Sequence, residues 1–98
     1  MSTLMTTTHK FASTPGEILL EEFLEPLGIS QYRLAKAMHV GQTAVGQIIA
    51  GKRAISTAMA FRLAKALGTS PEFWMNLQRD YELLTFDSSQ VGNIPQLV

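Results

Sequence analysis

Residues that start and stop helices recur along the chain at short intervals, and this pattern most limits what it can fold into. Four hydroxyl residues stand where a side-chain oxygen can cap a helix N-terminus: Thr14, Ser30, Ser56 and Ser70. Three glycines stand where a helix can end in a left-handed residue: Gly28, Gly51 and Gly68. Apolar residues at helical spacing follow each start. The pattern predicts an all-α domain of five short helices with tight connections.

The starts and stops also set the organisation along the chain. Residues 1–13 are rich in Thr and Ser and are predicted to be a flexible N-terminal arm, and residues 14–84 to form the helical domain. In its first helix, Ile18, Leu19, Phe23 and Leu27 form an apolar stripe. Residues 85–98 contain Asp, Ser, Gly, Asn and Pro, so we expect a C-terminal tail with little regular structure.

Composition narrows the class of protein. A length of 98 residues and a hydrophobic content of 46% suit one domain with one core. Cysteine is absent, and His9 and His39 have no metal-ligand spacing, so disulfides, thiolate chemistry and a metal site are not expected. There is no Ser/His/Asp set and no phosphate-binding glycine loop, so we expect neither an enzyme nor a cofactor.

Two features of the sequence bear on where in the cell the protein acts. No apolar run approaches the ~20 residues that cross a bilayer, so no membrane partner is expected. The first residues also lack the basic start and apolar block of a signal peptide. Both observations predict a cytoplasmic protein.

Charge is unevenly distributed although the net charge is zero. Residues 26–71 carry six basic residues and no acidic one, whereas residues 1–25 and 72–98 each have a net charge of −3. A local positive field matters more for phosphate binding than the sum over the whole chain. The basic middle therefore favours a nucleic-acid partner.

Residues 31–50 have the spacing of two helices joined by a short turn that contains glycine, a helix-turn-helix. Val45 and Ile48 would face inward, which leaves four residues of the second helix facing out: Gln42, Thr43, Gly46 and Gln47. A glutamine amide can pair with adenine, a threonine offers a hydroxyl and a methyl group, and a glycine lets the helix sit deeper in a major groove. Nearby cations would hold phosphates: Arg33, Lys52 and Arg53.

The stretch GISQYRLAKAMHVGQTAVGQIIAGKRAI resembles the lambda-repressor-like helix-turn-helix family. That resemblance implies that Gln31 contacts phosphate and braces Gln42, which recognises a base, and that Thr43 also contacts base edges. The family commonly has glycine at the position of His39. A histidine accepts positive φ less freely than glycine, so strain or a changed angle between the two helices is expected there.

A wider resemblance covers residues 14–84. PGEIL and EFLEPLG before the helix-turn-helix, and GTSPEFWMNLQ after it, are similar to the HigA-type antitoxins of bacterial toxin–antitoxin pairs. The resemblance implies a homodimer that binds a palindromic operator, represses its own operon and neutralises a small ribonuclease toxin of the HigB type. Two subunits would place their second helices in half-sites about one helical turn, ~34 Å, apart.

Alternatives remain for the function and for two surfaces. The chain could be a stand-alone phage-type repressor, or a toxin-binding module in which the helix-turn-helix is only scaffold. Glu17, Glu21 and Glu25 lie on one helix face, which is either solvated or contacts a basic toxin. Four residues of the last helix have the spacing of a core or a dimer seam: Trp74, Leu77, Tyr81 and Leu84.

Overall fold

The computed structural model describes residues 13–98, so the predicted arm lies outside the described residues except for Ser13. The first helical unit is continuous and comprises α2 (Pro15–Ile18), η1 (Leu19–Leu24) and α3 (Glu25–Leu27). Four helices follow: α4 (Gln31–Met38), α5 (Gln42–Ile49), α6 (Thr57–Leu67) and α7 (Pro71–Thr85). The described part of the chain contains no strand, and the predicted all-α, five-helix fold is confirmed.

The helix N-termini are capped at the predicted residues. Thr14 and Glu17 form a reciprocal capping box: the Glu17 N–H donates to Thr14 Oγ1 at 3.0 Å, and the Thr14 N–H donates to Glu17 Oε1 at 2.8 Å. The hydroxyls of Ser30, Ser56 and Ser70 each accept from the N–H three residues on. Local polar side chains therefore fix where each of these helices begins.

The first helical unit departs from the regular helix that the sequence predicts. Its central segment, η1, is a π-helix, and the Glu25 N–H donates to the carbonyl of Leu20, five residues back. Pro26 follows two residues after the end of this segment, and its ring would clash with the carbonyl four residues back in a regular α-helix. The wider turn changes which residues face the core: Leu24 is buried and Leu27 is 59% exposed. Leu27 was wrongly assigned to the apolar stripe.

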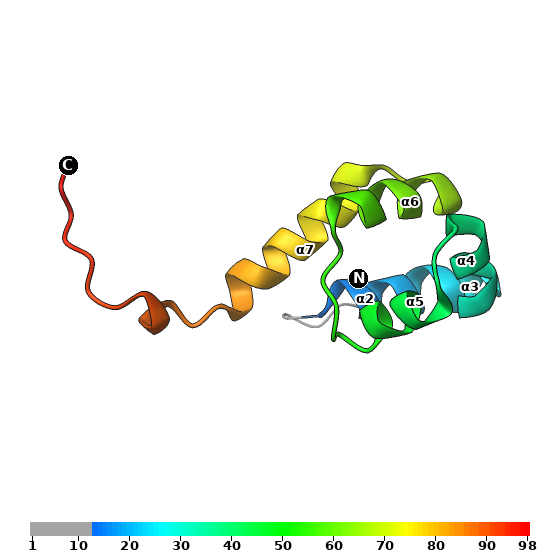
Figure 1. Cartoon of the computed structure of the whole chain (residues 1–98), viewed down its shortest axis with the longest axis horizontal. Helices are drawn as coiled ribbons and strands as arrows, with labels where there is room; N and C mark the ends of the chain where they lie inside the picture. Colours follow the sequence, from blue (N-terminus) through cyan, green and yellow to red (C-terminus); the bar gives the residue numbers. More distant parts are fainter. Residues whose placement is uncertain (1–12) are drawn as a thin grey trace, which may run out of the picture.

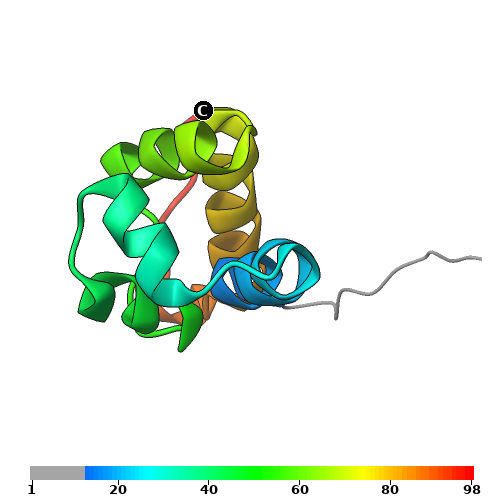
Figure 2. The same ribbon diagram turned by 90° about the vertical axis from the view of Figure 1, so that its right-hand side faces the viewer.

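The helices pack around one core. α4 contacts both α5 and α6, while α2 contacts α5 and α7, and α6 contacts α7 (Figures 1 and 2). Side chains from these elements meet in the interior, where the largest fully buried ones are Trp74, Leu19, Leu24, Leu34, Ile48, Leu63 and Val45. Trp74 also donates from Nε1 to Thr69 Oγ1 at 2.7 Å. The core thus fixes α5 against α2 and α4, with its other side exposed.

The C-terminal part of the chain leaves this core. α7 runs outward, and the tail continues away from the helices (Figure 1). Its one regular element is the 3₁₀ helix η2 (Ser88–Val91), which Asp87 caps. Hydrogen bonds from the hydroxyl and N–H of Ser89 lower the pKa of Asp87 below its ordinary value of 3.8. Among the helices of residues 13–98, none is long and apolar enough to span a membrane.

Candidate nucleic-acid interface

The exposed side of α5 carries the residues that the sequence predicts for base recognition. Gln42, Thr43 and Gln47 are exposed, while Val45 and Ile48 on the opposite side are buried. Gln42 and Thr43 lie in the first turn, which follows the N-cap Gly41. The outward face is uncharged and bears amides and a hydroxyl, groups that can pair with base edges in a major groove.

Gly46 and Gln31 lie against each other where α4 and α5 meet. A Cβ built on Gly46 would lie 3.7 Å from Gln31 Oε1 and, outside its own helix backbone, meet no other atom of residues 13–98 within 4 Å. The side chain of Gln31, at the start of α4, therefore reaches the middle of α5. Within the described chain, no hydrogen bond joins Gln31 to Gln42, whose bracing the family resemblance implies. The bracing of Gln42 by Gln31 therefore stays a prediction.

The loop after α5 presents Lys52 and Arg53 beside the same face. The Gly51 N–H donates to the carbonyl of Ile48 at 3.0 Å and the Lys52 N–H to that of Gln47 at 2.9 Å, a Schellman motif with Gly51 at φ 76°. The side chains of Lys52 and Arg53 are exposed, and Arg53 Nη1 donates to Gln47 Oε1 at 3.5 Å. Two cations thus flank the outward face of α5.

The turn between α4 and α5 contains the one non-glycine residue of residues 13–98 with positive φ, His39. Its φ of 60° and ψ of 42° are close to those of the glycines that end α3 and α6. The N–H groups of His39 and Val40 donate to the carbonyls of Lys36 and Ala35. The predicted unfavourable backbone conformation is therefore present, in a turn with its hydrogen bonds formed.

The basic middle of the chain is not all available for phosphate. Arg33 lies exposed on α4, near the first turn. Arg62, on α6, donates from Nη1 to the carbonyl of Met38 at 2.6 Å, where α4 ends. A cation there is also favoured by the negative end of the helix dipole. Arg62 therefore joins α6 to the helix-turn-helix.

Two residues that position α5 and its loop were missed in the sequence. A Cβ on Gly16 would lie 1.9 Å from the carbonyl oxygen of Ile48, so only glycine lets α2 approach the end of α5 this closely. Gln78, on α7, is a buried polar side chain that accepts from the Ile55 N–H at 2.9 Å. Gln78 lies four residues after Trp74, so it is a polar residue on the apolar face of the last helix. This position was the one sign in the sequence that Gln78 would be buried.

The four residues predicted as a core or a dimer seam fall into two groups. Trp74 is fully buried and contacts the rings of Phe23 and Phe73, at centroid distances of 5.2 and 4.9 Å. Leu77 and Tyr81 are half-buried, and Leu84 is 49% exposed. Trp74 is therefore a core residue, whereas the stripe becomes progressively more exposed toward the end of α7.

Comparison with known proteins identifies the same helix-turn-helix in this chain. A helix-turn-helix family model covers residues 20–74. The chain is 46% identical over 71 residues to YbaQ of Escherichia coli, an uncharacterized helix-turn-helix-type transcriptional regulator. This alignment spans 72% of this chain and 63% of YbaQ, so the chain covers less than two thirds of that relative.

Two further relatives are antitoxins. The chain is 42% identical over 79 residues to antitoxin HigA-1 of Vibrio cholerae, covering 81% of this chain and 74% of that protein. It is also similar to the solved structure of the Pseudomonas aeruginosa antitoxin HigA with the higBA promoter. There the identity is 41% and the TM-score 0.80, over 89% of this chain and 99% of that one. The chain therefore belongs to the helix-turn-helix family that includes the HigA-type antitoxins.

Proposed function

We propose that this chain is a HigA-type antitoxin that binds its own operator as a transcriptional repressor. The proposal rests on the outward face of α5. This face bears the uncharged polar side chains of Gln42, Thr43 and Gln47, and it lies beside Lys52 and Arg53. Uncharged amides and hydroxyls distinguish bases, and flanking cations anchor phosphates. The P. aeruginosa relative is described with its own promoter, which supports the same role here.

The proposal includes two protein partners. A second copy of the chain would allow two α5 helices to contact a palindromic operator, with half-sites ~34 Å apart. A small ribonuclease toxin of the HigB type would bind another surface and be neutralised. Both roles are binding roles without chemistry, and DNA binding would place the protein in the cytoplasm.

The proposal assigns base recognition to Gln42 and Thr43, phosphate contact to Gln31, Arg33, Lys52 and Arg53, and close approach to Gly46. Gln47 belongs to the base-reading face but also accepts from Arg53 at 3.5 Å. It can therefore orient the Arg53 side chain as well as contact DNA.

The test compares variants on the DNA upstream of the gene. Gln42→Ala with Thr43→Ala should reduce the preference for this DNA over an unrelated duplex by about 1–3 kcal/mol for each lost base contact. Gln90→Ala, an exposed amide in the tail, is the matched control and should change nothing. An unchanged preference in the double variant would contradict the assignment of these two residues.

A second readout separates the repressor from the toxin-binding role. The double variant should still rescue cells that express the toxin encoded beside it, because α5 would not contact the toxin. If no toxin gene adjoins this one, the protein is a stand-alone repressor. If the wild-type protein neutralises the toxin but does not bind DNA, the helix-turn-helix is scaffold.

A further inference from the structure

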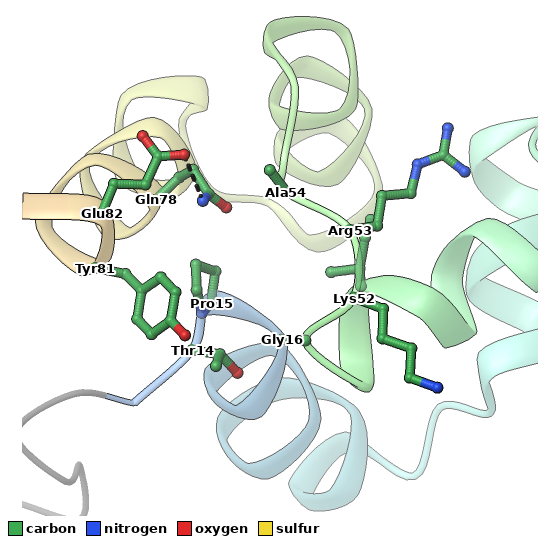
Figure 3. Close-up of a pocket in the computed structure, with 11 residues that line it drawn as sticks. Thr14, Pro15, Gly16, Lys52, Arg53, Ala54, Gln78, Tyr81 and Glu82 are labelled. Atoms are coloured by element: carbon green, nitrogen blue, oxygen red, sulfur yellow. Dashed lines mark hydrogen bonds between the residues drawn. The ribbon is translucent and has the colours of Figure 1, made fainter. Parts of the chain in front are cut away.

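Gln78 connects α7 to the loop that follows the proposed DNA-contacting helix. The side chain is 9% exposed, and its Oε1 accepts from the backbone N–H of Ile55 at 2.9 Å. Its Nε2 donates to Glu82 Oε2 at 3.0 Å, one turn further along α7 (Figure 3). Both ends of the amide are thus used, and they join two segments of the chain that are 23 residues apart.

The Ile55 N–H depends on this contact. Ile55 is 2% exposed, and its hydrogen bond to Gln78 is buried. A buried N–H that loses its acceptor is strongly unfavourable, so the backbone would move to find another acceptor. A cavity of about 220 Å³ adjoins this place, lined in part by Ala54, Gln78 and Glu82 (Figure 3). The loop therefore has space into which it can shift.

Lys52 and Arg53 lie in this loop, between the end of α5 and Ile55. Both side chains are exposed, and neither forms an ion pair within residues 13–98. The Lys52 N–H is held by the Gln47 carbonyl at one end of the loop, and Gln78 holds the Ile55 N–H at the other. The location of the two charges relative to α5 therefore depends on the backbone between these two anchors.

Glu82 fixes which way the Gln78 amide points. A carboxylate accepts hydrogen bonds and cannot donate, so it selects the Nε2 end of the amide. The Oε1 end is then left for Ile55, whose N–H can only donate. Glu82 is itself exposed and lies on the rim of the cavity.

From these contacts we infer that Gln78 is a positioning residue for phosphate binding. By fixing the loop after α5, it holds Lys52 and Arg53 where they can contact the phosphates of bound DNA. The inference rests on the proposed function, because it assumes that the two cations contact phosphates. It assigns no contact between Gln78 and DNA. The salt dependence of binding distinguishes this role from a contribution to stability alone.

The experiment measures the affinity of the full chain over a salt series, for its own upstream DNA and for an unrelated duplex. The slope of log K against log salt reports the number of phosphates neutralised. Gln78→Leu removes both hydrogen bonds at similar volume. It should make the slope shallower by about 1 to 2 and weaken binding roughly tenfold at low salt. The ratio of the affinities for the two duplexes should stay the same, because Gln42 and Thr43 are unchanged.

Ile55→Val is the matched control, since it trims the same loop but keeps the N–H and its acceptor. Thermal unfolding of both variants shows whether they lose similar stability. The control should retain the wild-type slope, because a smaller folded fraction scales affinity equally at every salt concentration. An equally shallow slope in Ile55→Val would overturn the inference, since packing alone would then explain the effect.

Two further outcomes are informative. If Gln78→Leu does not fold, Gln78→Asn replaces it, with an amide one methylene too short to reach Ile55, and the same shallower slope is expected. A wild-type slope in whichever variant folds would overturn the inference and leave the proposed function intact. If the wild-type protein binds neither duplex with salt dependence, the proposed function fails and the inference with it.

Discussion

Gly46 is proposed to let the middle of α5 approach DNA closely. It is half-buried, and an added Cβ would meet only Gln31 Oε1, at an ordinary contact distance of 3.7 Å. The fold therefore has room for alanine at this position. A glycine inside a helix nevertheless costs about 1 kcal/mol relative to alanine. Since residues 13–98 place no steric demand for glycine at this position, we propose that Gly46 serves an external contact.

Gly46→Ala tests this interpretation. The free energy of unfolding should rise by about 1 kcal/mol, because helix propensity improves without a clash. Affinity for the upstream DNA should fall, because the methyl group would hold α5 away from the groove. Urea denaturation and a DNA titration measure the two quantities. A more stable variant that binds DNA as well as the wild type would contradict the role of Gly46 at the interface.

His39 occupies a left-handed position that glycine adopts more easily. Left-handed backbone costs a non-glycine residue about 1–2 kcal/mol, and the greater freedom of glycine in the unfolded chain offsets roughly half of this. His39→Gly should therefore stabilise the fold by somewhat under ~1 kcal/mol in thermal or urea unfolding. Ala37→Gly, in the regular part of α4, should instead destabilise it by about 1 kcal/mol. A loss of stability in His39→Gly would show that the side chain makes a contact that outweighs the strain.

Structural roles that depend on nearby residues in the sequence could be predicted. The four caps follow from hydrogen bonds within a few residues, whereas the unfavourable backbone at His39 was expected from the family resemblance, in which glycine is common at that position. Gly16 and Gln78 were not predicted, because their partners Ile48 and Ile55 are more than twenty residues away. Only the packing of α2 and α7 on the α5 region reveals why these residues are needed.

Among the helices, α4 and α6 pack against each other, and one long side chain also forms a hydrogen bond between them. Arg62 Nη1 donates to the Met38 carbonyl at 2.6 Å, at the C-terminus of α4. Replacing Arg62 with Met keeps much of the side-chain length and removes this bond. We expect the free energy of unfolding to fall by about 1 kcal/mol, less than the ~1.5–3 kcal/mol typical of hydrogen bonds to charged groups, because the side chain is largely exposed.

Lys65→Met is the control for this prediction, as Lys65 lies on the same helix, is exposed and makes no such bond. Chemical denaturation of both variants should show a loss only for Arg62→Met. Equal stability of the two would mean that Arg62 contributes only positive charge. DNA affinity measured at the same time would then show whether that charge serves phosphate binding.

The helix bounds were largely predictable, because caps and glycines mark them. The exception was the π-helical segment η1, which no periodicity indicated. A single widened turn shifts the buried face, so Leu24 enters the core and Leu27 does not. Regular helical spacing places residues correctly only as long as the helix remains regular.

For the whole molecule, the exposed end of α7 is the surface we assign to dimerisation. Leu83 is 73% exposed and Leu84 49%, and Phe86 at the end of the helix is 56% exposed. Large apolar side chains gathered in this way favour a protein partner. The sequence predicted a core or a seam for four residues of this helix: Trp74, Leu77, Tyr81 and Leu84. Of these only Leu84 belongs to the exposed group, whereas Trp74 is fully buried.

Leu84→Asp should shift the protein from dimer toward monomer in sedimentation equilibrium, because a charge on the seam must be desolvated when two copies meet. Binding to a palindrome should weaken more than binding to a single half-site. Phe61→Asp, at a similarly exposed apolar residue of α6, is the control and should leave the mass unchanged. An unaltered dimer in Leu84→Asp would place the seam elsewhere.

We propose that α5 recognises bases while nearby cations anchor phosphates. The most direct measurement is binding of the purified protein to its own upstream DNA and to an unrelated duplex across a salt series. We expect a clear preference for the upstream DNA, with affinity that falls steeply as salt rises. Equal binding to both duplexes at every salt concentration would contradict base recognition by α5, and no binding at all would contradict the DNA-binding function.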